Sequence, residues 1–338
     1  MTAPDQLDPT PIIQMLQANQ VTAVLKSAID LGVFAALAKA AGDAGAVAMT
    51  IGCPQRSTAI LLDALAVLGL ATRRDTSYEL TPLARAFLVP GGPTYLGDAS
   101  NIFSGPLLWE GFGKLTEAVR ADGSVMKQHA ETPSNEFWET FARSSAALAF
   151  PAAAVLAEQL APLAAAKNGL RVLDVAAGSG IYGHTLLRTP GVDVTFLDWP
   201  NVLTETRAWG DRLGVDQARA HYVPGNVFDV ELGGPYDVVI ASHLYHHFDP
   251  QTCQALTRRL AGALAPGGRL AVHDFVTGSA LENPGATMFS LVMLVWTRHG
   301  KAYAQADYAS WMLEAGLARP SAHPLAGMPT SWLIAERR

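Results

Sequence analysis

Three histidines, His243, His246 and His247, lie close together directly after the apolar segment 237–242. Imidazole can take or release a proton near neutral pH, and the neutral ring is also a common metal ligand. A short apolar run that ends in polar residues is typical of a buried strand whose carboxyl end reaches the surface of a sheet. The sequence therefore predicts a strand that presents a general base, a metal site or both at its end.

A second motif with chemical meaning is LDVAAGSG, at 173–180. Its small residues let a strand turn sharply into a helix, which brings backbone N–H groups close to a ligand. No lysine follows the glycines, so the motif is not a phosphate-binding P-loop. Asp174 precedes the turn, and Asp198 ends the next apolar segment 198 − 174 = 24 residues later, where an acid suits the hydroxyls of a ribose. Taken alone, the pattern fits either NAD or S-adenosylmethionine (SAM).

The elements that must position these residues alternate between strands and helices from residue 169 onward. This alternation predicts a doubly wound α/β domain. We expect strands at 172–176, 192–197, 221–223, 238–242 and 270–275, helices at 182–188, 202–213 and 250–264, and two further strands at 318–325 and 331–335.

The N-terminal part has the outline of a winged helix. Helical spacing of apolar residues runs through 11–40 and 53–70, and 71–81 alternates like a short hairpin. The would-be recognition helix offers only Arg56 near its start, and a helix that reads the major groove needs several polar side chains. Burial of this apolar helix against a partner subunit explains it better than DNA binding. We expect domains at 1–100 and 167–338, joined by an aromatic-rich helical segment at 101–166 that lines a substrate pocket.

The composition sets limits on the function. The chain has 338 residues, of which 49% are hydrophobic and 16% charged, and this richness in apolar residues favours an oligomer. A net charge of −6 argues against a nucleic-acid partner. Cys53 and Cys253 are far apart, so the pattern indicates neither a disulfide framework nor a cysteine metal site. The apolar segment 144–166 is interrupted by Pro151, Glu158 and Pro162, and residues 1–11 lack a signal-peptide pattern. We expect no membrane span and a cytoplasmic enzyme.

Five further motifs follow in order: LDWPNV at 197–202, VPGNVF at 223–228, LYHHFDPQTC at 244–253, LAPGGRL at 264–270 and HGKAY at 299–303. With these motifs the chain resembles the class I SAM-dependent methyltransferases of the dimeric small-molecule O-methyltransferase type. The resemblance covers nearly the whole chain. It implies a C-terminal Rossmann-like, doubly wound SAM-binding domain, an N-terminal helical winged-helix dimerisation domain, a homodimer, and SAM as the cofactor.

The resemblance also implies roles for single residues. Asp198 matches the acid that binds the ribose of SAM, His246 matches the general base, and Asp274 matches a glutamate that orients this base. The other cofactor positions are Asp174, Gly178 and Gly180 around the methionine moiety, Trp199, Asn226 and Val227 near the adenine, and Ser242, where plant members have a lysine. The chain departs from the family pattern at Ala176, Asn226, His247 and Ala302, and the last two positions bear on the chemistry.

Two reactions fit these residues. O-methylation of a phenol, whose pKa lies near 10, needs only a nearby base such as His246. Alternatively, His247 and His299 could bind Fe or Zn, and the metal would chelate a 2-oxo acid and stabilise its enolate for attack on the methyl group. The pair of histidines resembles the metal ligands of the metal-dependent α-keto acid C-methyltransferases, a branch of the same family. His243 could be a third ligand, but packing explains it better.

From the sequence we therefore expect metal-assisted C-methylation of a 2-oxo acid, at the carbon next to the carbonyl, as a step in specialised metabolite or antibiotic biosynthesis. The apolar segment 288–296 favours a substrate with an apolar side chain. O-methylation of a phenolic or hydroxylated metabolite with His246 as the base is the alternative. A SAM-sensing winged-helix regulator is a remote third reading.

Overall fold

The computed structural model describes residues 7–39, 42–92, 94–132, 135–278 and 282–338. The chain divides into two compact units, Met1–Gly105 and Pro106–Arg338. The division places the predicted helical linker, from residue 106 onward, in the same unit as the sheet.

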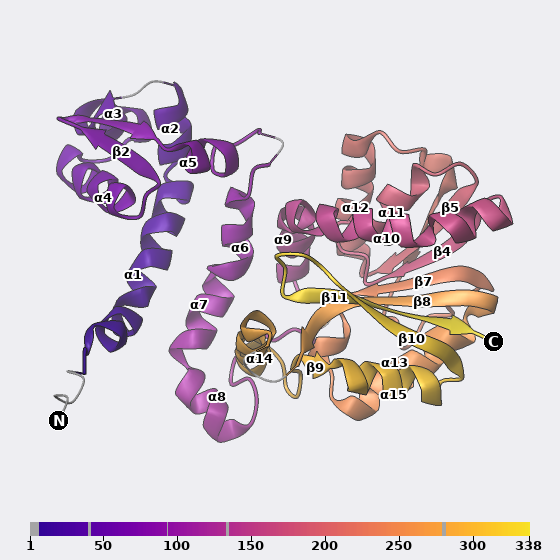
Figure 1. The fold of residues 1–338 in the computed structure, drawn as a ribbon. Coiled ribbons are helices and arrows are strands. Elements are labelled where there is room, and N and C mark those ends of the chain that lie inside the picture. Colours follow the sequence, from indigo (N-terminus) through magenta and orange to yellow (C-terminus); the bar gives the residue numbers. More distant parts are fainter. Residues whose placement is uncertain (1–6, 40–41, 93, 133–134, 279–281) are drawn as a thin grey trace, which may run out of the picture. The chain divides into compact units, whose positions relative to one another are not determined.

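The N-terminal unit combines the long helix α1 and several shorter helices with a small antiparallel sheet (Figure 1). The sheet has the order β1-β3-β2, and the β2–β3 hairpin turns at Asp75, which has a φ of 52°. Buried residues including Phe34, Leu62 and Tyr78 form its core. The elements are α1 (Thr10–Asp30), α2 (Val33–Lys39), β1 (Gly42–Asp43), α3 (Ala44–Ile51), α4 (Gln55–Val67), β2 (Ala71–Arg74), β3 (Ser77–Leu80), α5 (Pro82–Phe87), η1 (Gly97–Ala99) and α6 (Ser100–Phe103).

One helix expected in this unit is in fact two. The predicted helix over 11–40 ends at Asp30, because Gly32 adopts a left-handed φ of 72° that breaks the helical hydrogen-bond ladder before α2 begins. The second predicted helix begins at Gln55, directly after Pro54, which is its N-cap.

The C-terminal unit is built on one mostly parallel sheet with the strand order β10-β11-β8-β7-β4-β5-β6. Strands β4, β5, β6, β7 and the core of β8 run parallel, and β11 adds an antiparallel hairpin with β10. The strands are β4 (Leu170–Val175), β5 (Val192–Asp198), β6 (Ala220–Pro224), β7 (Tyr236–Ser242), β8 (Leu264–Thr277), β9 (Tyr303–Ala304), β10 (Leu317–Pro324) and β11 (Thr330–Arg337).

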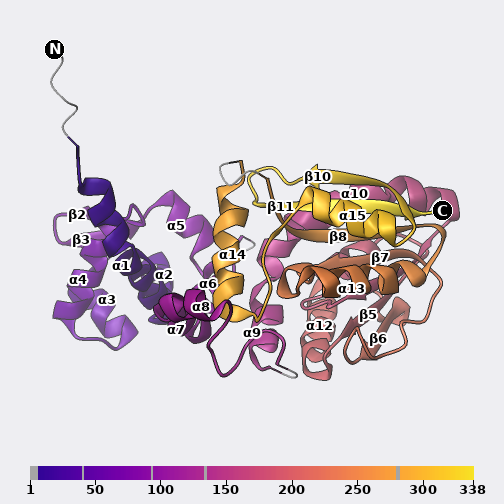
Figure 2. The same ribbon diagram turned by 90° about the horizontal axis from the view of Figure 1, so that it is seen from below.

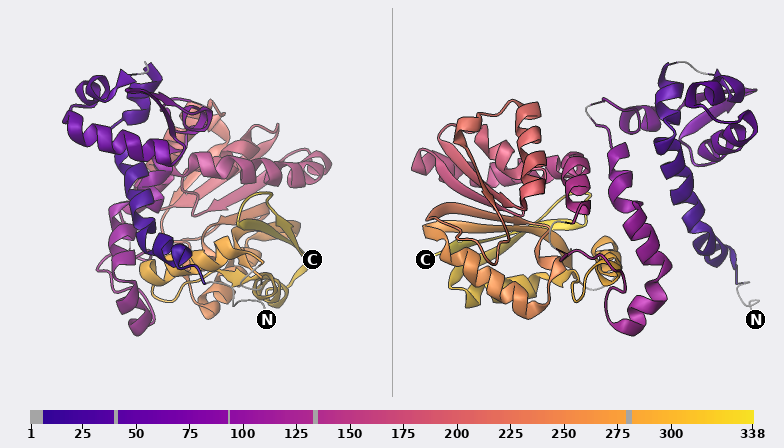
Figure 3. Two further views of the ribbon diagram at one scale, coloured as in Figure 1. Left: turned by 60° about the vertical axis from the view of Figure 1, so that its left-hand side comes forward. Right: turned by 180° about the vertical axis from the view of Figure 1, so that it is seen from behind.

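Helices cover both faces of this sheet (Figures 1, 2 and 3). One face packs against α10, α11 and α12, and the other against α13 and α15, which gives two separate apolar cores. A smaller apolar cluster joins α7, α8, α9 and α14. The helices are α7 (Pro106–Gly113), α8 (Leu115–Ala121), α9 (Phe137–Ser144), α10 (Ala146–Lys167), α11 (Ile181–Leu187), α12 (Pro200–Leu213), α13 (Pro250–Gly262), α14 (Pro284–Trp296) and α15 (Gln305–Glu314), with short η2 (Gln217–Arg219) and η3 (Tyr245–His247).

Helix α10 is long and apolar enough to cross a membrane by length and composition alone, as is the bent pair α1–α2 if it is counted as one span. Residues Ala152, Leu156 and Leu160 of α10 are buried against the sheet, so this helix packs as a core helix of the unit.

Candidate active site

The glycine-rich turn between β4 and α11 is held in a left-handed backbone conformation. Ala176, Gly178 and Gly180 have φ values of 52°, 56° and 71°. A Cβ atom on Gly180 would lie 2.6 Å from Cγ2 of Thr206, so the position requires glycine. Ala176 adopts a conformation that costs a residue with a side chain roughly 1–2 kcal/mol, which is the physical reason for a glycine at this position in the family pattern.

Side chains behind the turn fix its carbonyl and amide groups. The Thr206 hydroxyl donates to the Gly178 carbonyl at 2.7 Å, and His184 Nε2 donates to the Thr206 carbonyl at 2.9 Å. Asp174 Oδ2 accepts from the amide of Gly183 in the first turn of α11 at 3.0 Å. Burial raises the pKa of Asp174 to about 8. Asp174 therefore caps α11 from behind the turn, where no side chain of Gly180 can do so.

Asp198 stands at the carboxyl end of β5 and faces the turn. Its Oδ2 accepts from the Gly178 amide at 2.9 Å, and its Oδ1 accepts from the Trp199 amide at 2.7 Å. Burial raises the pKa of this carboxyl group to about 6, although both amide hydrogen bonds oppose the shift. The carboxylate is thus fixed in position at the edge of the sheet.

A cavity of about 300 Å³ opens at this edge. Six of the predicted cofactor residues line it: Gly178, Asp198, Trp199, Asn226, Val227 and Ser242. Asp174 and Gly180 lie behind the turn and are absent from the lining. Aromatic side chains from α9, Trp138 and Phe141, close the opposite wall. The cavity combines a fixed carboxylate, loop backbone and apolar walls. An adenosine-containing ligand needs these groups, because its ribose hydroxyls donate hydrogen bonds and its base packs against apolar surface.

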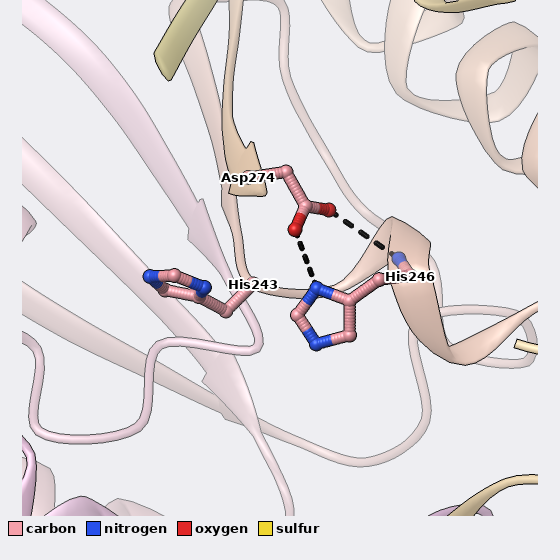
Figure 4. A group of neighbouring side chains, drawn as sticks. All are labelled: His243, His246 and Asp274. Carbon is pink, nitrogen blue, oxygen red and sulfur yellow. Dashed lines mark hydrogen bonds and ion pairs between the residues drawn. The ribbon is translucent and has the colours of Figure 1, made fainter. Parts of the chain in front are cut away.

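His246 and Asp274 form a buried pair beside the cavity (Figure 4). His246 Nδ1 donates to Asp274 Oδ1, and the His246 backbone amide donates to Oδ2 at 3.3 Å. Burial alone would raise the pKa of Asp274, but His246, with smaller contributions from His243 and the Phe275 amide, outweighs burial and lowers it to about 2. Since Nδ1 carries the donated proton, Nε2 is left as the basic nitrogen.

Two neighbouring histidines line the cavity while His246 itself lies just outside the lining. The His247 ring lies 4.4 Å from that of His246 and edge-on to Trp138 at 5.3 Å. Burial lowers the pKa of His247 well below its usual value, and its Nδ1 atom has no hydrogen-bond partner among the described residues. His243 has a left-handed φ of 51°, and burial lowers its pKa to about 4. Burial therefore favours the neutral form of both rings.

The two predicted metal ligands, His247 and His299, differ in their burial. His247 is buried, whereas His299 is exposed at the turn after α14. Among the described residues, His243, His246 and Asp274 form a group whose possible metal-ligand atoms all lie within 4.8 Å of one another. This group includes the His246–Asp274 pair and neither of the predicted ligands.

Sequence reasoning missed several residues that shape the site. Phe289 of α14 stacks on Phe275 at 3.6 Å and meets the His246 ring edge-on at 4.8 Å. His273 Nδ1 contacts the Ser242 hydroxyl at 3.2 Å and the Tyr182 hydroxyl at 2.9 Å. A signal for the first contact was present in the sequence, since 288–296 is apolar apart from Ser290, but a cross-strand histidine leaves no local signal.

Comparison with known proteins identifies two families along the chain. Residues 13–90 match the O-methyltransferase dimerisation domain, and residues 139–318 match the O-methyltransferase domain. The chain is 29% identical to the 3-hydroxy-5-methyl-1-naphthoate 3-O-methyltransferase of Streptomyces sahachiroi, over 93% of this chain and 91% of the relative. It is 28% identical to the acetylserotonin O-methyltransferase of Mus musculus, over 91% of this chain and 83% of the relative.

Solved structures share the fold over the whole chain. A crystal structure of a protein from Nostoc punctiforme superimposes with a TM-score of 0.91 at 29% identity, covering 98% of this chain and 100% of the other. Human N-acetylserotonin methyltransferase in complex with SAM has a TM-score of 0.83 at 22% identity, over 100% and 99% of the two chains. The predicted fold, a Rossmann-like methyltransferase domain with an N-terminal helical dimerisation domain, is confirmed.

These relatives overturn the reaction expected from the sequence. The curated relatives are named for methylation of oxygen on naphthoate, acetylserotonin, tetracenomycin and mitomycin skeletons. C-methylation of a 2-oxo acid was therefore the wrong expectation. The prediction gave too much weight to the pairing of His247 with His299, which occurs within an otherwise ordinary O-methyltransferase pattern.

Proposed function

Because the chain belongs to the dimeric O-methyltransferase family and is a SAM-dependent methyltransferase, we propose that it methylates a hydroxyl group of a phenolic or hydroxylated small molecule. The general base of this reaction is His246. The observation that carries the proposal is the buried His246–Asp274 pair at the edge of a cavity lined by Asp198.

The residues around the cavity fit SAM. Asp198 would accept hydrogen bonds from the ribose hydroxyls, and Trp199, Asn226 and Val227 would lie against the adenine. The turn at Gly178 and Gly180, capped by Asp174, would face the methionine moiety, with Ser242 on the same side of the cavity. When bound, SAM supplies an electrophilic methyl group on a sulfonium ion. The fixed carboxylate and the left-handed glycine turn support this assignment.

The His246–Asp274 pair is suited to removing a proton from a hydroxyl group. Asp274 accepts the Nδ1 proton, which fixes the tautomer and leaves the Nε2 lone pair to take the substrate proton. Positive charge that develops on the imidazole is stabilised by the adjacent carboxylate. A phenol with a pKa near 10 needs no stronger activation than this, so the proposed reaction uses no metal. We assign no metal to His247 and His299.

The proposal is tested by steady-state methyl transfer from SAM to a panel of hydroxylated aromatics, comparing the wild type with His246→Gln. The substitution should lower kcat by roughly 100- to 10,000-fold, the usual contribution of a positioned general base, while the Kd for SAM stays within a few fold. His221→Gln, on an exposed position of β6, is the matched control and should keep the wild-type rate. A wild-type kcat in His246→Gln would refute the assignment of the base.

A further inference from the structure

The cavity contains a carboxylate that the proposed function does not use. Glu131 lies in its wall, and its side chain is 25% exposed. Asp198 is the other acidic side chain in the lining that the structure describes, and it belongs to the nucleoside end of the cavity. The role of Glu131 therefore depends on whether it lies nearer to the nucleoside end of the cavity or to the proposed base.

Two neighbouring groups hold the Glu131 carboxylate in place. The backbone amide of Arg298 donates to Oε1 at 3.1 Å, and His129 Nδ1 lies 2.6 Å from Oε2. The Arg298 guanidinium lies 3.4 Å from His129 Nε2 and donates to it. Oε2 of Glu131 is buried, and neither it nor His129 Nδ1 has a hydrogen-bond partner among the described residues. A carboxylate can accept about four hydrogen bonds, so acceptor sites remain after these contacts.

Contacts of the segment that carries Glu131 connect it to the residues around the proposed base. Ala130 donates its amide to the Trp296 carbonyl at 2.9 Å, so this segment is bonded to the end of α14. The turn that follows α14 touches the base directly, since a Cβ on Gly300 would lie 2.2 Å from the His246 carbonyl oxygen. Trp138, whose indole donates to the Ala130 carbonyl at 3.1 Å, also meets the His247 ring.

From this placement we propose that Glu131 is a specificity-determining residue that accepts a hydrogen bond from a second donor on the substrate. The substrate class is an aromatic compound with a hydroxyl group to be methylated and a further hydroxyl or amino group. The inference rests on the proposed function and deepens it. The aromatic walls exclude water when a ring is bound, so a substrate without the second donor leaves a remaining acceptor site of the carboxylate without water or a hydrogen bond, which is costly.

The test compares methyl transfer to dihydroxynaphthalenes, with the second hydroxyl at different ring positions, against transfer to 2-naphthol, which has no second donor. The wild type should prefer at least one dihydroxy isomer by about tenfold or more in kcat/KM. Glu131→Leu should remove this preference, so that kcat/KM for the dihydroxy isomer falls to about that for 2-naphthol. The kcat/KM for 2-naphthol itself should change little, and the Kd for SAM should be unchanged. A merely structural role would lower the rates for both kinds of substrate together.

Two further variants keep the test decisive. Glu131→Gln preserves the shape of the side chain and should lower the preference several-fold even if the leucine variant does not fold. Glu136→Gln, at an exposed position five residues away, is the control and should keep the wild-type preference. A wild-type preference retained in a folded Glu131 variant would overturn the inference while leaving O-methylation intact. An absence of O-methylated product from every probe with the wild type would instead count against the proposed function.

Discussion

At the scale of single residues, Asp274 determines how His246 can act. The carboxylate accepts both the ring Nδ1 proton and the backbone amide of His246, and a third hydrogen bond comes from the Phe275 amide at 2.8 Å. The family pattern commonly has a second acid near the base, and this chain has Ala302 at that position, which is buried. We therefore expect the orientation of His246, the proposed base, to depend on Asp274.

Asp274→Asn should consequently lower kcat by about 100-fold or more at pH 8. The amide keeps the shape of the side chain but removes the negative charge that stabilises the imidazolium ion. Binding of SAM, measured by calorimetry, should be unchanged because Asp274 does not line the cavity. A kcat within twofold of the wild type would contradict the role given to Asp274.

We expect Asp198 to make cofactor binding depend on pH. Burial raises its carboxyl pKa to about 6, so the carboxylate predominates above this pH and the neutral acid below it. The ionised form is the better acceptor for ribose hydroxyls, and the affinity for SAM should therefore fall as the pH decreases through about 6. Asp198→Ala should weaken binding at pH 7.5 by roughly 1.5–3 kcal/mol, the scale of a hydrogen bond to a charged group.

The measurement is the Kd for SAM at pH values from 5 to 8, by calorimetry, for the wild type and Asp198→Asn. The variant should bind weakly at every pH and lack the decrease near pH 6. A wild-type affinity that is flat between pH 5 and 8 would place the ribose site elsewhere.

At the scale of elements, the turn after α14 supports the base through close backbone contact. A Cβ atom on Gly300 would lie 2.2 Å from the His246 carbonyl oxygen and 2.9 Å from the carbonyl carbon of His247, so η3 would have to move. Gly300→Ala should lower kcat by about tenfold or more with an unchanged Kd for SAM, because a small displacement of a catalytic group is costly.

Gly262→Ala, in α13, is the control for this variant. A Cβ at Gly262 meets nothing within 4 Å and requires no unusual φ. Equal kcat values for the two alanine variants would show that the contact at Gly300 does not position the base.

Some helices and strands could be predicted from the sequence, and others could not. Strong local patterns located β5, β7 and the glycine turn closely, because alternating βα segments and a left-handed turn leave clear composition signals. Helix α15 and the start of β8 escaped prediction, since the LAPGG segment at 264–268 has a turn composition yet pairs at Leu264 with Tyr236 of β7. The role of Glu131 depends on contacts with residues near 298, far along the chain, and such contacts leave no local pattern.

The residue types at the site were easier to predict than their partners. Asp198, Ser242 and Asn226 line the cavity as their positions in the motifs suggested. His299 was paired with His247 through the resemblance to the metal-dependent C-methyltransferases, whereas the structure leaves it exposed. A histidine pattern therefore carries less information than the burial and hydrogen bonding of each ring.

At the scale of the whole molecule, α1 presents apolar side chains that the chain itself leaves uncovered. Ile12, Met15 and Leu16 are 63%, 74% and 79% exposed. This helix lies within the matched dimerisation domain, so we expect it to be covered by the second subunit.

Leu16→Glu combined with Met15→Glu should shift the protein from dimer to monomer, because each charge would have to be buried unpaired in the interface. Light scattering after size-exclusion chromatography measures the change. Leu313→Glu, which adds a charge to an exposed apolar position of α15 in the C-terminal unit, should leave the dimer intact. A dimeric double variant would exclude this face of α1 as the main contact.

The central claim is that oxygen receives the methyl group without the help of a metal. It is tested most directly by supplying SAM with a ¹³C-labelled methyl group, together with a mixture of hydroxylated aromatics and 2-oxo acids, and reading the products by NMR with and without a chelator. We predict a labelled methoxy group on an aromatic product, in equal yield in both samples. A labelled carbon–methyl bond on a 2-oxo acid, lost on chelation, would contradict the account.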